Sequence, residues 1–200
     1  MQMSAFVYKR RAPLSIPLRL LDYAISADTY ESVLSALGVG IRAAAKRIDS
    51  GGEEVADYEV EIVENLLGVA YVTCQPQITA IVQGVLRLPD HGLNARVLRD
   101  RGPRFDSNYS KVEVLWGLAN YFKHRDEWSR STWTNPPNKM TAHTVKVITA
   151  AGLSSGSTGN LRTGAEALGN TAYSDVTVFE EIVRSWAANV REHIREKFGS

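Results

Sequence analysis

Apolar residues recur at three- and four-residue spacing along most of this 200-residue chain, which is the period of an amphipathic α-helix. The densest example is Lys111–Trp128, KVEVLWGLANYFKHRDEW, where a broad apolar arc faces a narrower polar arc. No segment alternates apolar and polar residues over the length that a half-buried β-strand needs. The sequence therefore predicts an all-α protein that folds as a helical bundle.

The apolar period predicts about five to seven helices, preceded by an irregular N-terminal arm over residues 1–16. Proline suits the first helical turn, so a first helix is expected to begin near Pro17. A long polar loop, Pro89–Tyr109, precedes the Lys111–Trp128 helix, and one helical domain is expected over residues 1–200. The other expected helices are Ser26–Arg47, Glu53–Leu88 kinked or broken near Pro76, Thr141–Gly152 with Thr141 as N-cap, Leu161–Leu168 and Val176–Phe198. The last of these has an apolar stripe formed by Phe179, Ile182, Val183, Trp186, Val190 and Ile194.

Composition and charge limit the possible classes of protein. With 44% hydrophobic and 22% charged residues, the chain has the composition of a globular protein. A formal net charge of +1 gives no overall field for nucleic acid or anionic membrane, so such a partner would need a local basic patch. Cys74 is the only cysteine, which excludes an internal disulfide. We expect its side chain to be buried like that of a small hydrophobic residue.

No targeting, metal or cofactor motif is visible. Neither an unbroken signal-peptide core nor a run of ~20 apolar residues is found, so we expect a cytoplasmic protein without membrane contact. HxxxH, HExxH and CxxC spacings are missing, so no metal is expected. The glycines between Gly152 and Gly164 follow no predicted strand, which favours a flexible connection over a phosphate loop. We therefore expect no cofactor.

The polar arc of the Lys111–Trp128 helix is the best candidate site. Asn120 and His124 lie one helical turn apart, and Trp116 and Trp128 extend the same row. Histidine titrates near neutrality and its partner sets the tautomer, so this pair is a workable acid–base arrangement. A structural interpretation also fits, because cations near a helix C-terminus complement the helix dipole and tryptophans can close the edge of a core.

The eleven-residue segment LANYFKHRDEW resembles the signature helix of HEPN domains, helical bundles that are common in prokaryotic defence and toxin–antitoxin systems. The family motif is an arginine, usually followed by a polar residue such as asparagine, with a histidine four to six residues after the arginine. Asn120 and His124 match the polar position and the histidine. The arginine position falls at Ala119, and Arg125 projects about 100° away from His124 around the helix.

The resemblance implies an RNA partner, a homodimer and a mechanism. Active family members are metal-independent endoribonucleases in which the histidine assists attack by the ribose 2′-hydroxyl and the arginine steadies the phosphate. In this chain the positive charge would come from Lys123 or from the loop residues Arg99, Arg101 and Arg104, or the domain binds RNA without cutting it. Losing one such charge costs on the order of a hundredfold or more, so we expect a weak or inactive nuclease.

Two other functions are compatible with the sequence. The near-zero net charge and the missing motif arginine fit a non-catalytic interaction module, such as an adaptor or the protein partner of a toxin. A kink at Pro76 could instead open a pocket for a small molecule inside the bundle.

Overall fold

The computed structural model describes residues 29–50, 53–88, 92–170 and 176–198. These residues contain eight α-helices, one 3₁₀ helix and no strand, which confirms the all-α class. The number exceeds the expected five to seven because two of the helices, α4 and α6, span only five residues each. The arm expected over residues 1–16 and the helix expected near Pro17 lie outside the described residues.

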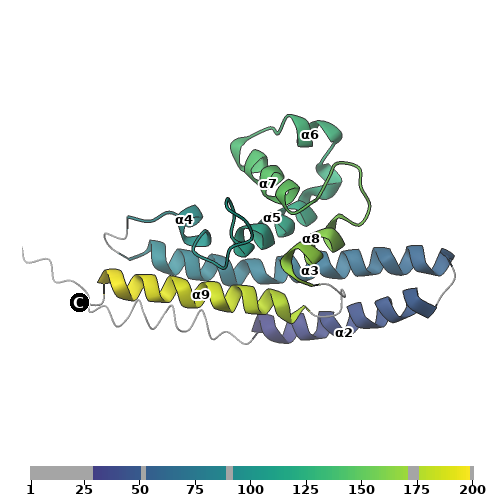
Figure 1. Cartoon of the computed structure of the whole chain (residues 1–200), viewed down its shortest axis with the longest axis horizontal. Coiled ribbons are helices and arrows are strands. Elements are labelled where there is room, and N and C mark those ends of the chain that lie inside the picture. The colour runs from purple at the N-terminus through teal and green to yellow at the C-terminus, as the bar shows by residue number, and fades with distance from the viewer. Residues whose placement is uncertain (1–28, 51–52, 89–91, 171–175, 199–200) are drawn as a thin grey trace, which may run out of the picture.

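Three long helices form an elongated layer, and the shorter elements cover one side of it (Figure 1). The long helices are α2 (Thr29–Ser50), α3 (Glu53–Leu86) and α9 (Thr177–Phe198). The covering elements are α4 (Ala95–Arg99), α5 (Lys111–His124), the 3₁₀ helix η1 (Arg125–Glu127), α6 (Arg130–Thr134), α7 (Lys139–Ala150) and α8 (Asn160–Leu168). The central helix is α3, which contacts α2, α4, α5, α8 and α9. None of the described helices combines the length and apolar character needed to span a bilayer.

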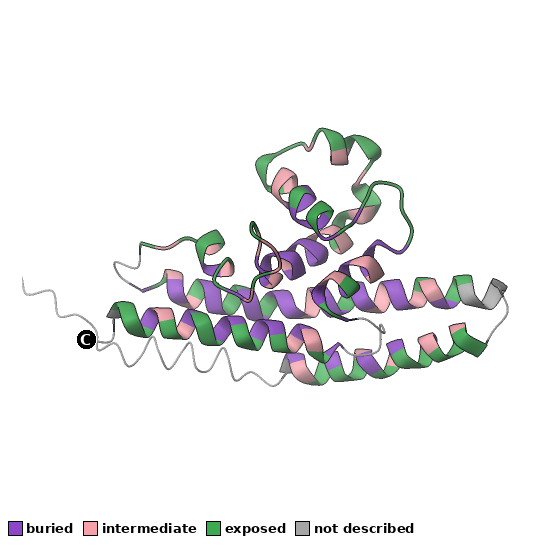
Figure 2. Cartoon of the chain, viewed as in Figure 1, coloured by how far each residue is buried: buried purple, intermediate pink, exposed green. Residues whose placement is uncertain are grey.

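The core lies around α3, where purple, buried turns of several helices meet (Figure 2). The Tyr71 ring packs against Phe179 with 5.0 Å between centroids, and its hydroxyl donates to the Leu161 carbonyl at 2.6 Å. Trp186 donates through Nε1 to the Leu98 carbonyl at 2.8 Å, so these large buried side chains keep their polar atoms bonded. The stripe expected on the last helix is confirmed as buried: Phe179, Ile182, Val183, Trp186, Val190 and Ile194.

The break expected at Pro76 does not occur, because α3 continues through this residue as one helix. Proline removes one backbone hydrogen bond and costs about 3 kcal/mol inside a helix. Cys74 and Ile78, on either side of it, are fully buried in one core, and Thr79 donates from its hydroxyl to the Gln75 carbonyl at 2.8 Å. Burial of both halves of the helix outweighs the lost bond.

The expected Lys111–Trp128 helix ends early, because α5 stops at His124 and the chain turns through η1. Trp128 has extended backbone, with φ −87° and ψ 109°, and does not continue the row of Asn120 and His124. Its indole packs on the rings of Tyr121 and Trp133, with 5.6 and 5.8 Å between centroids. The turn after His124 allows this aromatic packing, which a continuous helix would prevent.

Helix α7 begins before the expected Thr141 cap. Its N-cap is Asn138, whose side-chain oxygen accepts the backbone N–H of Thr141 at 2.9 Å. Thr141 is therefore the third residue of α7, and its own N–H is the donor in the capping bond. Asparagine and threonine can both cap a helix, and in the structure the earlier residue, Asn138, is the cap.

Candidate functional site

Asn120 and His124 line one surface cavity of about 440 Å³, so the structure brings the two predicted catalytic residues together. The other sides of the cavity come from η1, α7 and the segments beside them, including Glu127, Trp128 and Met140. This cavity lies where α5 ends and the chain turns back. The helical spacing of four residues thus places the amide and the imidazole on a shared, solvent-open surface.

His124 is half exposed and has one carboxylate neighbour. Its side chain is 50% exposed, and its Nδ1 lies 3.3 Å from Oε2 of Glu127. A carboxylate beside Nδ1 favours the tautomer that carries the proton on Nδ1. Nε2 is then the ring nitrogen that can accept a proton from a substrate.

Asn120 is held by a buried neighbour on α3. Its Oδ1 accepts a hydrogen bond from Nε2 of Gln75 at 3.0 Å, and Gln75 also donates to the Trp116 carbonyl at 3.4 Å. Gln75 is itself buried, with 7% of its surface exposed. This contact orients the amide and leaves its Nδ2 as the donor for a ligand in the cavity.

The predicted RNA-binding cations are not gathered around His124. Lys123 lines a separate hollow of about 550 Å³ beside Pro76 on α3, although α3 has no break there. The guanidinium of Arg99 lies 4.9 Å from the ring centre of Trp116, and burial lowers its pKa. Trp116 precedes His124 by eight residues, or about 12 Å along α5.

The two remaining loop arginines also face other groups. Arg104 pairs with the Asp100 carboxylate at 2.5 Å and donates to the carbonyl oxygens of Asp106 and Ser107. Arg101 is exposed near α9, and its carbonyl accepts a hydrogen bond from Asn189 at 3.1 Å. Arg104 therefore stabilises its own loop, and neither side chain lines the His124 cavity.

Trp128 lines the His124 cavity and also a second cavity of about 490 Å³. Tyr121 and Trp133 line this second cavity, together with Arg125, Arg130 and residues 155–157. The three aromatic rings pack edge to face, with centroids 5.6 to 5.8 Å apart. This cluster is not among the sites predicted from the sequence, although the sequence carries a signal for it in the two tryptophans on either side of Arg130 in WSRSTW.

Two arginines supply positive charge beside these rings. Arg130 is exposed at the start of α6. Arg125 is held in place, because it donates to Asn65 Oδ1 at 2.7 Å and its guanidinium lies 4.9 Å from the Phe122 ring centre. Aromatic faces next to guanidinium groups can stack a nucleobase and bind the phosphate attached to it.

A phosphate loop would bind its ligand with the backbone N–H groups at the start of α8. In this structure those groups bind a carboxylate of the protein itself. Glu64 of α3 accepts the backbone N–H groups of Leu161 at 3.0 Å and Arg162 at 2.8 Å. The helix N-terminus is thus already neutralised by a negative group. Within the ranges that the structure describes, no three His, Cys, Asp or Glu side chains gather as a metal site.

Comparison with known proteins adds no family to this description. No family model, no curated protein and no solved structure matches the chain. The resemblance of the α5 segment to HEPN domains therefore stays a prediction.

Proposed function

We propose that this chain is a HEPN-like prokaryotic protein of defence or toxin–antitoxin type that binds single-stranded RNA around Trp128. In this proposal it is a weak or inactive metal-independent endoribonuclease with His124 and Asn120 at the cleavage position. One observation carries the proposal: the Trp128 indole lines both the cavity of His124 and the cavity of Arg125 and Arg130. A strand whose base stacks in the second cavity can place a neighbouring nucleotide beside the imidazole.

The binding energy in this proposal comes from stacking and local charge. Stacking one base on an aromatic side chain contributes about 1–3 kcal/mol, and it tolerates any sequence because every base has a flat face. Arg125 and Arg130 supply the phosphate contacts that the net charge of +1 does not provide over the whole surface. Duplex RNA keeps its bases stacked on each other, so single strands are the preferred form.

The cleavage chemistry is incomplete in this site. Nε2 of His124 can accept the proton of a 2′-hydroxyl, and the Asn120 amide can donate to a phosphate oxygen. The amide is neutral, and none of the residues that line the His124 cavity in the described part of the chain is an arginine or a lysine. Without a positioned cation the developing phosphate charge is poorly stabilised, which lowers the rate on the order of a hundredfold or more.

Binding is tested by fluorescence anisotropy with a labelled single-stranded RNA, over a range of salt concentrations. Arg130→Gln removes one phosphate contact, so it weakens binding and reduces the salt slope by about 0.7. Arg195→Gln on α9, where the native guanidinium pairs only with Glu192 at 3.7 Å among the described residues, leaves both unchanged. Equal effects of the two substitutions, or equal affinity for duplex RNA, would contradict the proposed site.

Cleavage is tested separately, with stoichiometric protein and a metal chelator. The expected result is slow nicking that leaves a cyclic phosphate, because the 2′-hydroxyl is the attacking group. His124→Ala abolishes nicking and leaves RNA affinity within about twofold, since stacking and phosphate contacts lie elsewhere. If the native protein nicks no RNA, the proposed ribonuclease activity is wrong and the proposal is reduced to RNA binding.

The runner-up is a non-catalytic interaction module, and exposed apolar side chains on the long helices favour it. Val39 on α2 is 59% exposed and Tyr58 on α3 is 66% exposed. Such residues suit a protein contact, either a partner or the homodimer that the HEPN resemblance implies. Sedimentation equilibrium tests the dimer. We place this function in the cytoplasm, which fits a chain whose one cysteine is free and buried.

A further inference from the structure

A second cluster of ionisable side chains lies near the start of α5, outside the proposed RNA site. Glu113 is 3% exposed, and its Oε1 is 3.5 Å from Nε2 of His143 on α7. Within the described part of the chain, this buried Oε1 has no hydrogen-bond partner. Eleven residues separate Glu113 from His124, or about 16 Å along α5, so the two imidazoles belong to different sites.

Glu113 also helps to cap the N-terminus of α5, and this role gives one of its two carboxylate oxygens a partner. It is the third residue of α5 and completes a capping box with Ser110, whose Oγ accepts the Glu113 backbone N–H at 3.1 Å. In return the Ser110 backbone N–H bonds to the carboxylate and lowers its pKa, although burial is the larger effect and raises it. Capping accounts for one oxygen, and the other lies beside the half-buried His143 ring.

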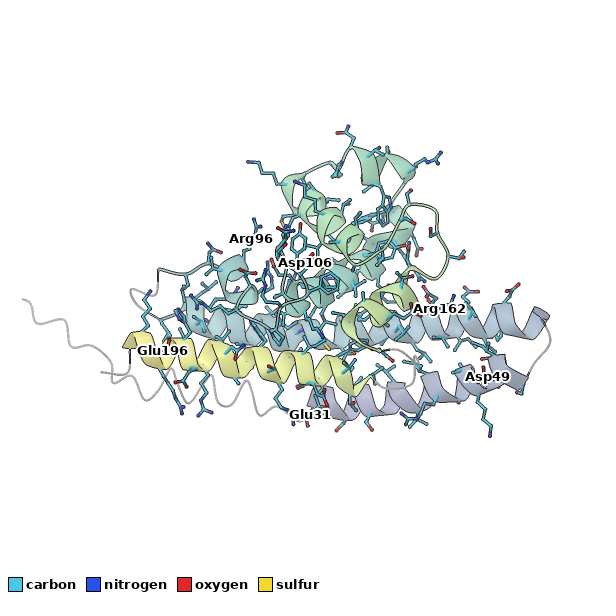
Figure 3. All side chains as sticks on the ribbon, in the orientation of Figure 1. Glu31, Asp49, Arg96, Asp106, Arg162 and Glu196 are labelled. Atoms are coloured by element: carbon cyan, nitrogen blue, oxygen red, sulfur yellow. The ribbon has the colours of Figure 1, made fainter. Side chains whose placement is uncertain are left out.

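Positively charged side chains on two helices, α4 and α7, act on the pKa of His143. Burial is the main cause of its lowered pKa, followed by the charges of Arg96 and Arg99 on α4 and of Lys146 on α7 itself. Arg96 is exposed and is labelled between α4 and α7 in Figure 3. Arg99 is partly buried against Trp116. The charges of Arg96, Arg99 and Lys146 therefore act on the imidazole, and those of Arg96 and Arg99 also act on the buried Glu113 carboxylate.

The other acidic groups near this surface are already engaged. Asp100, whose charge reaches Glu113, pairs with Arg104 at 2.5 Å. Asp106 accepts the backbone N–H groups of Asn108 and Tyr109 within its own loop. The Tyr109 ring lies 6.1 Å from the His143 ring and completes the surroundings. Neither Asp100 nor Asp106 thus forms an ion pair with Arg96, Arg99 or Lys146.

We propose that Arg96, Arg99 and His143 form a binding site for a phosphate group, with Glu113 as the residue that positions and charges the imidazole. A bound phosphate adds negative charge to the three cations and draws a proton onto His143. The imidazolium then lies between the phosphate and the Glu113 carboxylate. Binding consequently takes up a proton, and affinity rises as the pH falls. This inference does not depend on the proposed RNA site.

The test uses sulfate, a tetrahedral anion whose charge is constant from about pH 5.5 to pH 7.5, followed by NMR of the histidine and arginine side chains. We expect sulfate to raise the pKa of His143 and to shift the Arg96 and Arg99 signals. Affinity should increase several-fold on going from about pH 7.5 to 5.5. Arg96→Gln should abolish most of the binding, and Arg195→Gln on α9 should not change it.

Two further variants separate a binding site from a purely structural ion pair. His143→Gln should remove the pH dependence of sulfate binding. Glu113→Gln keeps an oxygen for the Ser110 capping bond and removes the charge that stabilises the imidazolium, so the rise in the pKa of His143 on sulfate binding and the gain in affinity at low pH should both become smaller. A structural pair would change stability in both variants and leave sulfate binding untouched. That result, or sulfate shifts spread evenly over all surface arginines, would overturn the proposal.

The phosphate can belong to an RNA backbone or to a free nucleotide, and competition distinguishes them. If RNA is the source, a short single strand without a terminal phosphate displaces sulfate, and Arg96→Gln weakens RNA binding. If a nucleotide is the source, a nucleoside monophosphate binds more tightly than sulfate and the RNA does not compete. Failure of both to displace sulfate would overturn the assignment to a phosphate ligand.

Discussion

A hydrogen bond of 3.0 Å joins the Glu64 carboxylate on α3 to the backbone N–H of Leu161 on α8, across 97 residues of sequence. The first N–H groups of a helix have no partner inside it, and Gly159 at the N-cap position has no side chain to offer. Glu64 therefore caps α8 from another helix. The contact also fixes the loop whose residues 155–157 line the Trp128 cavity.

Glu64→Ala should lower the free energy of unfolding by about 2–4 kcal/mol, because one buried and one partly buried N–H group lose their acceptor. Glu64→Gln keeps one side-chain oxygen and should lose about half as much. Urea denaturation measures both, with exposed Glu61→Ala on the same helix as the matched control. Equal stability of the Glu64 and Glu61 alanine variants would contradict the capping role.

Gly68→Ala should destabilise the protein by about 1–3 kcal/mol, because the added methyl group would overlap the ring of Phe122. Gly84 lies on the same helix, and apart from its chain neighbours and its own helix backbone no atom lies within 4 Å of an added methyl group. Gly84→Ala should therefore stabilise the protein by about 0.5–1 kcal/mol through helix propensity. Thermal unfolding of the two variants compares them directly, and a loss of stability in both would disprove the steric explanation.

The pairing of Gly68 with Phe122 allows a further check by a double-mutant cycle. Phe122→Ala removes the ring that the new methyl group meets, so the losses of Gly68→Ala and Phe122→Ala should not add. If the two losses of stability add exactly, the destabilisation by Gly68→Ala does not come from contact with the Phe122 ring.

Cys74 should be inert toward thiol reagents in the native protein. Burial, with a smaller contribution from Glu180, raises its pKa to about 12, so the reactive thiolate is scarce. A colorimetric disulfide reagent should label it only after urea unfolds the chain. A Cys74→Ala, Ser155→Cys variant carries its thiol on the exposed loop and should react at once. Rapid labelling of native Cys74 would show that this part of the core opens readily.

His143 should make the protein less stable as the pH falls below about 6.5, the ordinary pKa of histidine. Burial and the nearby cations lower its folded pKa, so the unfolded chain binds the proton more readily and protonation favours unfolding. His143→Gln should reduce this loss, as measured by urea unfolding at about pH 7.5 and 5.5.

The loss should be reduced and not abolished, because burial and Arg101 also lower the pKa of His193. Glu113, whose pKa is raised by burial, acts in the opposite direction, since its protonation at still lower pH favours the folded state. An unchanged pH dependence in His143→Gln would contradict the environment described for this ring.

Local sequence patterns predict the helices well where burial follows a single period. The last helix shows this, because its six expected core residues are all buried and its observed bounds differ by one residue at the start. The end of α5 could not be predicted in this way. It depends on Trp128 packing against Trp133, a residue outside the expected helix and beyond the reach of periodicity.

The candidate sites likewise contain residues that helical spacing predicts and residues that only tertiary packing brings together. Asn120 and His124 share a cavity because four-residue spacing on a helix already places them together. Arg130 reaches the neighbouring cavity only because the chain reverses after His124. The capping box of Ser110 and Glu113 is visible in the sequence as S-x-x-E, but the approach of His143 requires the packing of α7 on α5.

The position of RNA on the surface is the most direct test of the proposed function. A single-stranded RNA containing 4-thiouridine can be photocrosslinked to the protein, and mass spectrometry then identifies the attached peptides. We expect crosslinks at Tyr121, Trp128 or Trp133, whose rings line or adjoin the two cavities. Crosslinks confined to α2 or α9, or no crosslink at RNA concentrations that saturate binding, would contradict it.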